Sequence, residues 1–368
     1  MTTAFVYDSR YAGYDFGRGH PFSPARQQLL LQLLEAVDIH LPLIAPRPAP
    51  DEAIRQAHSR EYVDYVRKAS RKPKRDLLPR FGFGTPDVPL FRGMHDAAAL
   101  LAGGTLHAAE LVADGEASIA LSLGGGLHHA QRSSAAGFCV YNDLSIAIAY
   151  LRSRGLRVAY LDVDVHHGDG VQAMFYDDPN VMTISLHESG HYLYPGTGFA
   201  HEIGDGDGRG YSINVPLEPD TDDDLYMDAF ENVVPHVLSW FQPDVLVVQC
   251  GVDAHTADPL ADLRLTSRGF HALFARILNL INTHAVGRGV LTLGGGYNLD
   301  ATVRSWAVLI ATLLAEELPA EIPRISSQVS TNLYDPIEQL PPERRRLVAA
   351  HNGGAVKRVL EFAAPHWM

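Results

Sequence analysis

The chain has 368 residues, with 43 acidic residues against 30 lysines and arginines, so its formal net charge is −13. Hydrophobic residues make up 46% of the chain and charged residues 20%, which is enough apolar material for a large core and excludes a mainly disordered protein. Cys139 and Cys250 are its two cysteines, which excludes a disulfide scaffold and a cysteine-ligated zinc finger.

The sequence also limits where the protein works and what it binds. It has no apolar run of the roughly 18 residues that a membrane helix needs, and residues 1–10 lack the features of a signal peptide, so we expect a cytoplasmic protein with no membrane contact. The net acidity argues against binding to DNA, because a phosphate backbone repels an acidic surface. Residues 67–75 form a basic run, which we interpret as a solvated loop at a helix end, with a site for an acidic partner as the alternative.

Short β-rich runs alternate with amphipathic stretches along the chain, which predicts an α/β fold with a mostly parallel sheet and helices on both faces. Strands are predicted at residues 4–7, 117–123, 157–165, 181–187, 212–217, 245–250 and 289–293. Helices are predicted at residues 24–34, with Ser23 as the cap and Pro24 in the first turn, and at 53–58 after Asp51, 96–113, 144–154, 222–240, 267–284 and 301–316. Without a repeat or a low-complexity linker, residues 1–368 are expected to form a single domain. The Pro- and Gly-rich stretches 73–93 and 190–210 are predicted to be long loops, which are often functional.

The predicted strand at residues 157–165 begins as an apolar run and then becomes polar at every second residue. The period of a strand places Asp162, Asp164 and His166 on one side, opposite Val163 and Val165. Carboxylates and an imidazole that converge at a strand end suit a divalent metal such as zinc. The alternative is a helix-capping aspartate beside histidines that face solvent, but burying so many ionisable groups without partners costs several kcal/mol.

Three other predicted strands also end in unusual polar residues. Asp253 follows the strand at 245–250, and it is either a third metal ligand or the cap of the next helix. His128 and His129 follow the strand at 117–123, and Tyr297 follows the strand at 289–293. Open α/β sheets bind ligands at the carboxyl ends of their strands, so we expect these side chains to meet at one edge of the sheet.

Together these residues predict the hydrolysis of an amide or an ester. Asp164, His166 and Asp253 would leave a zinc ion one open position, as catalytic sites require, and the same set also accommodates Fe²⁺. The adjacent histidines His128 and His129 can supply a general base and a general acid.

Three further side chains complete the expected machinery. Asp162 and Asp169 are spare carboxylates, each able to orient one of the two imidazoles and to raise its basicity. The phenol of Tyr297, which follows three glycines, can donate a hydrogen bond to a developing oxyanion.

Several segments form a recognisable series along the chain. They are His20-Pro21 and residues 124–130 (GGGLHHA), 137–143 (GFCVYND), 161–170 (LDVDVHHGDG), 185–187 (SLH), 194–198 (YPGTG) and 294–298 (GGGYN). This series resembles the zinc-dependent histone deacetylases of the arginase/deacetylase superfamily, and among them the bacterial acetoin-utilization deacetylases. The likeness extends from Tyr7 to Leu313 and implies the arginase/deacetylase fold, with the C-terminal remainder packed on it as helices or a tail.

The resemblance also implies a role for each site residue. The zinc ligands would be Asp164, His166 and Asp253, and the catalytic residues His128, His129, Asp162, Asp169 and Tyr297. The substrate-binding residues would be Asp87 at the rim, Gly137 as an acceptor for the substrate amide, and Phe138 and Tyr194 on either side of the acyl-lysine stem. A structural potassium ion would be held by Asp162, Asp164, His166, Ser185 and Leu186, and Arg26 would line an internal channel that releases acetate.

The implied reaction is the removal of acetyl or other acyl groups from lysine side chains of proteins or peptides. In the acetoin-utilization subgroup the implied substrate is a metabolic enzyme such as an acetyl-CoA synthetase. Leu127 stands where the nuclear enzymes have Trp, which favours that subgroup, and Tyr194 replaces the Phe of many relatives but keeps a stacking face. Three glycines precede Tyr297, where many members have four.

Three other functions are alternatives to a lysine deacetylase. Arginase-type enzymes hold two manganese ions and need carboxylates where this chain has Gly168 and His255, so a mononuclear site is favoured. An acetylpolyamine deacetylase would need an acidic rim, for which the chain offers Glu188, Glu202, Asp205 and Asp207. A catalytically dead binding module would lack a ligand or Tyr297, and every matched position is intact.

Overall fold

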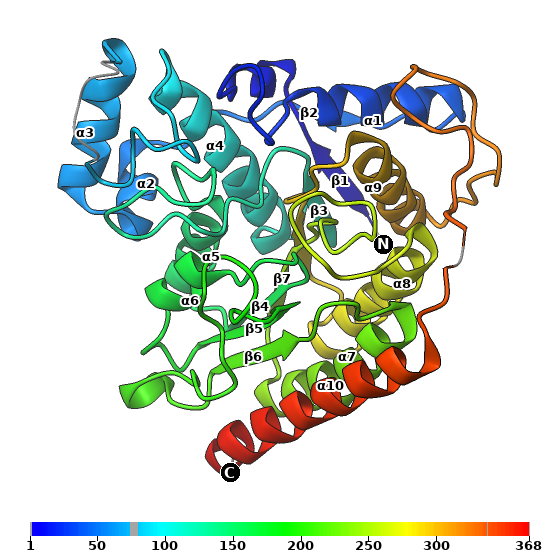
Figure 1. Ribbon diagram of the computed structural model, residues 1–368. Helices are drawn as coiled ribbons and strands as arrows, with labels where there is room; N and C mark the ends of the chain where they lie inside the picture. The colour runs from blue at the N-terminus through cyan, green and yellow to red at the C-terminus, as the bar shows by residue number, and fades with distance from the viewer. Residues whose placement is uncertain (1, 74–79, 337, 368) are drawn as a thin grey trace.

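The computed structural model describes residues 2–73, 80–336 and 338–367. Its centre is an eight-stranded sheet in which every pairing is parallel, with the order β2-β1-β3-β8-β7-β4-β5-β6. The strands are β1 Thr3–Val6, β2 Leu43–Ile44, β3 Ile119–Ser122, β4 Val158–Asp162, β5 Val181–Glu188, β6 Ser212–Leu217, β7 Val245–Gln249 and β8 Gly289–Thr292. The predicted α/β class with helices on both faces of a parallel sheet is therefore confirmed (Figure 1).

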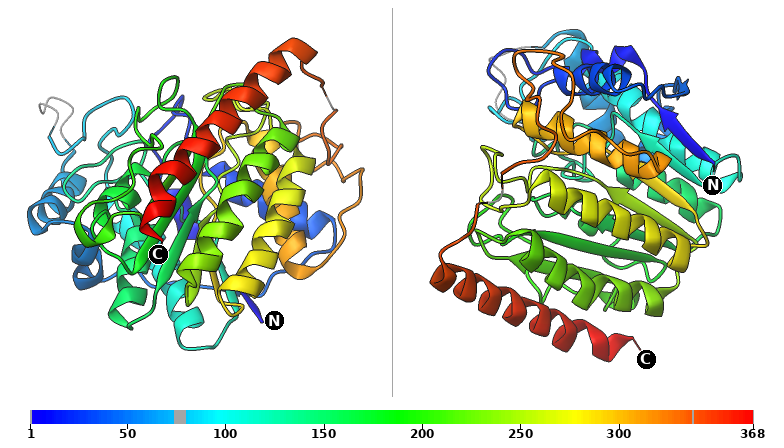
Figure 2. Two further views of the ribbon diagram at one scale, coloured as in Figure 1. Left: turned by 90° about the horizontal axis from the view of Figure 1, so that it is seen from below. Right: turned by 90° about the vertical axis from the view of Figure 1, so that its right-hand side faces the viewer.

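Helices cover both faces of the sheet. They are α1 Ala25–Ala36, α2 Asp51–Ala57, α3 Arg60–Arg71, α4 Met94–Ala113, α5 Asp143–Ser153, α6 Asp169–Met174, α7 Asp223–Phe241, α8 Ser267–His284, α9 Leu299–Leu314 and α10 Pro342–Ala363. Helices α4 and α5 pack on one face, and on the other α1, α9, α8, α7 and α10 lie side by side in that order (Figure 2). In the described part of the chain, no helix has the length and apolar character needed to cross a membrane.

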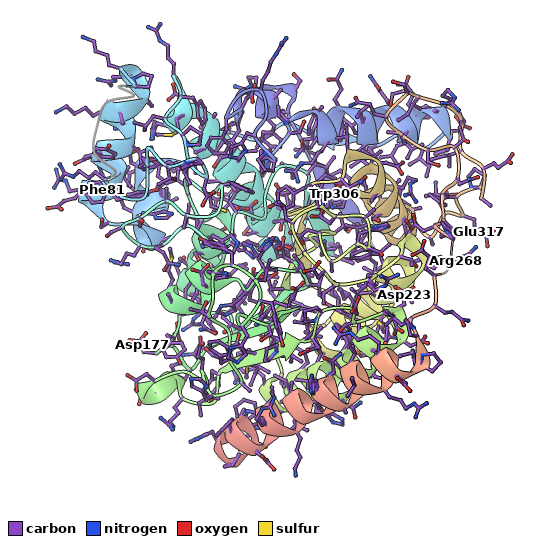
Figure 3. The ribbon with its side chains drawn as sticks, in the orientation of Figure 1. Phe81, Asp177, Asp223, Arg268, Trp306 and Glu317 are labelled. Atoms are coloured by element: carbon purple, nitrogen blue, oxygen red, sulfur yellow. The ribbon has the colours of Figure 1, made fainter. Side chains whose placement is uncertain are left out.

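The central strands are apolar on both sides because both faces are covered. In β7, Leu246 and Val248 join the cluster that contains Trp306 of α9, whereas Val245 and Val247 join the cluster beneath α4 and α5. Trp306 is fully buried and lies well inside the molecule in Figure 3. In the four central strands β3, β8, β7 and β4, the buried residues Ser122, Thr292, Gln249 and Asp162 are each the last residue of the strand.

The structure adds elements to the predicted set. The short edge strand β2 and the helices α3 and α6 were not predicted, and α10 was expected only within a C-terminal remainder of helices or a tail. The strand predicted at 157–165 ends at Asp162, where the chain leaves the sheet. Helix α10 buries few of its residues, among them Val348 and Val359, so its apolar signal is weak. The predicted helix at 267–284 has the bounds of α8.

The interpretation of the basic run as a solvated loop is wrong for its first part. Arg67, Lys68 and Arg71 belong to α3, and the guanidinium of Arg67 bonds Asp51 at the start of α2. Ser59 caps this helix by accepting from the amide of Tyr62, a start signal that the sequence contained. Lys72 is the C-cap residue of α3, and the last two basic residues, Lys74 and Arg75, lie outside the described residues.

Candidate active site

The polar residues that follow β3, β4, β7 and β8 meet at the carboxyl edge of the sheet, as the sequence predicted. These strands are neighbours in the centre of the sheet (Figure 1). Asp162 is the last residue of β4 and is paired in register with Gln249 of β7 and Ser185 of β5. Parallel strands in register therefore bring residues that are far apart in sequence to one place.

Asp164, His166 and Asp253 form a compact set of donors. One ligand atom from each lies within 4.8 Å of the others, and all three residues are buried. The Nδ1 atom of His166 is 3.1 Å from Oδ1 of Asp164 and 3.1 Å from Oδ2 of Asp253. Two carboxylate oxygens and one imidazole nitrogen suit a divalent cation such as zinc.

The other oxygen of each carboxylate is occupied by the protein. Oδ2 of Asp164 accepts from the side chain of Gln249 at 2.6 Å and from the amide of Gly295 at 2.9 Å, and Oδ1 of Asp253 accepts from the amide of Val165 at 2.9 Å. Sequence reasoning missed Gln249, although a lone polar residue in the apolar run of β7 was a visible signal. These contacts fix the carboxylates so that their remaining oxygens face His166.

Electrostatics favours a cation at this position. Burial and the repulsion of Asp164 raise the pKa of Asp253 to about 7. Burial lowers the pKa of His166, but hydrogen bonds and attraction from Asp164 and Asp253 outweigh it and raise that pKa to about 10. Two buried carboxylates around one imidazole need a positive charge, so the donor set fits a divalent metal.

His128 and His129 lie beside this set with their Nε2 atoms 3.1 Å apart. Nδ1 of His128 is 2.7 Å from Asp162, which also accepts from the hydroxyl of Tyr160 at 2.5 Å. Nδ1 of His129 is 2.7 Å from Asp169. The expected pairing of each imidazole with its own carboxylate is thus present in the geometry.

The two histidines have opposite protonation preferences. Burial lowers the pKa of His128, but the charges of Asp162 and Asp164 outweigh it and raise that pKa to about 9. Burial and the charge of His128 lower the pKa of His129 to about 4, although Asp169 acts in the other direction. One imidazole therefore favours the protonated form and the other the neutral form.

Two residues at the start of α5 hold the turn that carries these histidines. The sequence alone did not assign them this role. The side-chain amide of Asn142 donates to the carbonyls of His128 and Ala130, at 3.1 Å each. The buried carboxylate of Asp143 accepts from the amides of Gly126 at 3.0 Å and Leu127 at 2.7 Å. The motif at residues 137–143 contains both residues, but only the fold reveals what they contact.

Tyr297 faces the same cavity. Its amide donates to Asp258 at 2.7 Å, and its ring lies 5.6 Å from Phe138 and 6.3 Å from His166, measured between ring centroids. Burial, together with the charges of Asp253 and Asp164, raises the pKa of the phenol well above its usual value, so the hydroxyl keeps its proton.

A small cavity of about 20 Å³ lies between these groups. Its lining includes His128, His129, Asp164, Phe138 and Tyr297. A wider surface pocket of about 540 Å³ lies between the loop at 189–201 and α10, but none of the candidate site residues lines it. The chemistry of the residues, and not the size of the hollow, therefore locates the site.

The Histone deacetylase domain model matches residues 20–313. The chain belongs to the histone deacetylase family. The acetoin utilization protein AcuC of Bacillus subtilis is 38% identical over 373 residues, which cover 97% of this chain and 96% of that protein. Histone deacetylase clr6 of Schizosaccharomyces pombe is 34% identical over 325 residues, which cover 87% of this chain and 78% of that protein. The chain is also similar to the crystal structure of an HDAC homolog from Aquifex aeolicus, with 29% sequence identity and a TM-score of 0.84. The matched region covers 96% of this chain and all of the homolog's chain.

Of the substrate-binding residues expected for this histone deacetylase family member, Gly137 and Phe138 line the small cavity. Tyr194 is 44% exposed, and its ring centroid lies 5.1 Å from that of His129. Gly137 has a positive φ of 48°, and a Cβ there would lie 2.3 Å from the His129 ring, so only glycine fits. Asp87 is exposed, and its carbonyl lies 3.1 Å from Nε2 of His20.

Two of the residues expected to hold potassium, Asp164 and His166, belong to the donor set itself, and the other three lie on β4 and β5. Asp162 and Ser185 are partners across β4 and β5, and Leu186 follows Ser185 in the same strand. Oδ1 of Asp162 accepts from the amide of Asp164 at 3.1 Å, and the hydroxyl of Ser185 lies 2.8 Å from Nδ1 of His187.

Arg26 lies behind the cavity, in the interior. Its guanidinium donates to the carbonyls of Gly294 and Gly296, at 3.0 Å each, and lies against the rings of Phe22 and Trp306. Burial lowers its pKa. This position is where the resemblance expects an internal channel.

The four carboxylates that an acidic rim for a polyamine would need differ in their surroundings. Glu188 is buried, and Glu202 accepts from the amides of Gly198 and Phe199 at 2.9 Å each and from the side chain of Gln172 at 2.8 Å. Asp205 is exposed, but its amide bonds the carbonyl of Tyr176, beside Asp177 at the periphery of Figure 3. Glu188 and Glu202 are thus engaged within the protein, whereas the carboxylates of Asp205 and Asp207 are exposed.

The donor set leads to a first prediction. Replacing Asp164 or His166 by Ala is expected to abolish retention of a divalent metal, because two protein ligands hold zinc poorly. Elemental analysis of purified protein measures the metal, and the exposed carboxylate variant Asp205→Asn serves as the control. Full metal occupancy in Asp164→Ala would show that the ion is held elsewhere.

Proposed function

We propose that this deacetylase removes acetyl groups from lysine side chains of proteins or peptides and that it depends on zinc. The observation that carries the proposal is the donor set Asp164, His166 and Asp253 beside a histidine pair whose Nε2 atoms are 3.1 Å apart. A metal set next to a base and an acid is the arrangement that metal-assisted amide hydrolysis needs.

Asp164, His166 and Asp253 would hold the metal, with Zn²⁺ as the expected ion and Fe²⁺ as the alternative. When bound, this ion would supply Lewis acidity toward the substrate carbonyl and toward water. Potassium would be held by Asp162, Asp164, His166, Ser185 and Leu186, where it would offset the charge of the buried carboxylates.

The histidine pair would move the protons. His129, whose pKa is lowered to about 4, is neutral near pH 7 and can accept a proton at Nε2 from the attacking water. His128, whose pKa is raised to about 9, carries a proton that it can give to the leaving amine. Asp162 and Asp169 keep the two rings oriented through their Nδ1 atoms.

Tyr297 would stabilise the transition state. Its phenol keeps its proton and can donate to the oxyanion that develops on the substrate carbonyl. Phe138 and Tyr194 would flank the stem of the acylated lysine, Gly137 would accept from its amide, and Asp87 would contact the substrate backbone at the rim. Arg26 would line the path by which acetate leaves.

The substrate is proposed to be an acetylated protein, with an acetyl-CoA synthetase suggested by the likeness to the AcuC proteins. The whole chain, residues 1–368, is proposed to be one catalytic domain. An acetylated polyamine is the alternative substrate; two of the four carboxylates that would form its rim, Glu188 and Glu202, are engaged within the protein, and Asp205 and Asp207 are exposed.

Turnover of a panel of substrates tests the proposed function. Acetyl-lysine peptides, including peptides from an acetyl-CoA synthetase, are expected to be cleaved with a higher kcat/KM than acetylated polyamines, and release of acetate is measured with the zinc content known. Faster cleavage of the polyamines, or no cleavage of any peptide by fully zinc-loaded protein, would overturn the assignment to protein lysine.

Tyr297→Phe removes only a hydroxyl. Turnover of an acetyl-lysine peptide is expected to fall roughly 10²–10³-fold, the usual effect of losing one oxyanion donor, while zinc content and thermal stability stay unchanged. Steady-state kinetics measures the loss. Unchanged kcat and kcat/KM in the variant would remove Tyr297 from the chemistry.

The pH dependence of turnover tests the role of His128. A general acid with a pKa of about 9 is protonated below that pH, so kcat is expected to fall as the pH rises through this region. Asp162→Asn removes the strongest influence that raises this pKa, so the alkaline limb should move to lower pH. Asp205→Asn should leave the limb in place. An unmoved limb in Asp162→Asn would assign it to another group.

A further inference from the structure

Asp335 is an almost buried carboxylate beyond the part of the chain that the family model matches. It lies between α9 and α10, whereas the match ends at residue 313, and its side chain is only 12% exposed. Oδ2 of Asp335 accepts from the amide of Ser267 at 2.9 Å and from its hydroxyl at 2.8 Å. Oδ1 accepts from the guanidinium of Arg304 at 2.8 Å.

The fourth partner of Asp335 is His255, two residues after Asp253. Nε2 of His255 lies 2.9 Å from Oδ2 of Asp335, and Nδ1 of His255 accepts from the amide of Ala257 at 3.1 Å. Because Nδ1 is an acceptor, the ring proton is on Nε2 and is donated to Asp335. His255 is 1% exposed, so both of its nitrogens are occupied inside the protein. This orientation also explains why His255 is not a ligand for a second metal.

The same carboxylate is tied to the helix that follows Tyr297. Arg304 of α9 is 4% exposed, donates to Asp335, and also makes two contacts of 3.0 Å with Asp300 in the same helix. A buried guanidinium between two carboxylates is a strong, directional contact. Hydrogen bonds from His255 and Arg304 hold the pKa of Asp335 well below its usual range, although burial acts in the opposite direction, so the group is ionised.

Two of the residues that contact Asp335 belong to, or directly follow, the two segments that carry Asp253 and Tyr297. The amide of Val252 donates to the carbonyl of Gly295 at 2.9 Å, and Asp258 accepts from the amide of Tyr297 at 2.7 Å. The segment that carries Asp253 and the segment that carries Tyr297 are therefore bound to each other on the cavity side. Asp335 joins the same two segments on the far side, through His255 and Arg304.

We propose that Asp335 is a positioning residue that acts through His255 to hold Asp253 in place for the metal. The inference rests on the proposed metal site. By this proposal, the segment between α9 and α10 not only connects the two helices but also helps to position a metal ligand.

Other contacts of the C-terminal region serve only its attachment and supply a control. Arg345 of α10 bonds Asp222 at 2.7 Å, at the start of α7. Arg268 lies over the ring of Tyr334 at 4.3 Å, on the side of the molecule where Glu317 is labelled in Figure 3. Neither contact involves a residue of the candidate active site.

Affinity for Zn²⁺, measured by competition with a chelator on the folded full-length protein, tests the proposal without reference to activity. Asp335→Asn and His255→Leu are each expected to lower the affinity roughly 10-fold, the lower end of the effect of losing a direct partner of a metal ligand, because His255 acts on Asp253 only through the backbone between them. The double variant should bind zinc no more weakly than Asp335→Asn alone, because the contact between His255 and Asp335 is already broken in that variant. His255→Gln keeps a donor at the position of Nε2 and should restore most of the affinity. Arg345→Ala should lower the unfolding temperature alone.

Additive losses in the double variant, or an unchanged affinity in Asp335→Asn, would overturn the proposal. If Asp335→Asn does not fold, the contrast between His255→Gln and His255→Leu decides: equal affinities in these two variants would overturn it. Failure of the proposed function is seen separately, as zinc-loaded wild-type protein that binds the metal normally but does not cleave acetyl-lysine peptides.

Discussion

Two buried carboxylates that face one imidazole are the constraint on which the rest of this structure depends. Asp164 and Asp253 lie within hydrogen-bond distance of the same nitrogen of His166, out of contact with solvent. Like charges buried together are unfavourable unless a cation joins them and the remaining lone pairs find donors. The protein supplies those donors from Gln249 and from the amides of Gly295 and Val165. Burial lowers the pKa of His166, but the two carboxylates raise it to about 10. They therefore favour a positive charge at this point, and a divalent metal supplies such a charge.

The parallel sheet brings these polar groups together without placing any of them in the middle of a central strand. Strands β4 and β7 are neighbours and end level with each other, so Asp162 and Gln249 are partners in register. Helices on both faces bury the flanks of the strands, and the carboxyl edge is left as the position where polar groups can gather. Asp164 lies two residues past Asp162, and Gln249 crosses from β7 to bond it. The register of the strands therefore also supplies the hydrogen-bond donors that the buried carboxylates need.

Much of this was predictable from the sequence, because strands and helices have local signatures. The apolar runs predicted every strand except the two-residue β2, and the polar residues just past four strand ends predicted the donor set, the histidine pair and Tyr297. The resemblance to histone deacetylases then implied the roles of the residues. Three contributors were not predictable: Asn142 and Asp143 bond the backbone of residues 126–130, and Asp335 bonds a histidine 80 positions earlier. Such contacts depend on which segments the fold places together, and no periodicity along the chain records that.

The local sequence also does not show which histidine of the pair is the acid and which is the base. His128 and His129 are identical residues, adjacent in sequence, and each bonds an aspartate at 2.7 Å, so nothing local distinguishes an acid from a base. The distinction comes from the surroundings. Both rings are desolvated, but His128 faces the charges of Asp162 and Asp164, whereas His129 faces one aspartate and the protonated His128. Their pKa values are thereby driven apart in opposite directions, which is how two groups of one type come to hold a proton and to accept one at the same pH. Because the carboxylate that most separates them is the last residue of β4, the division of labour between the two histidines follows from where that strand ends.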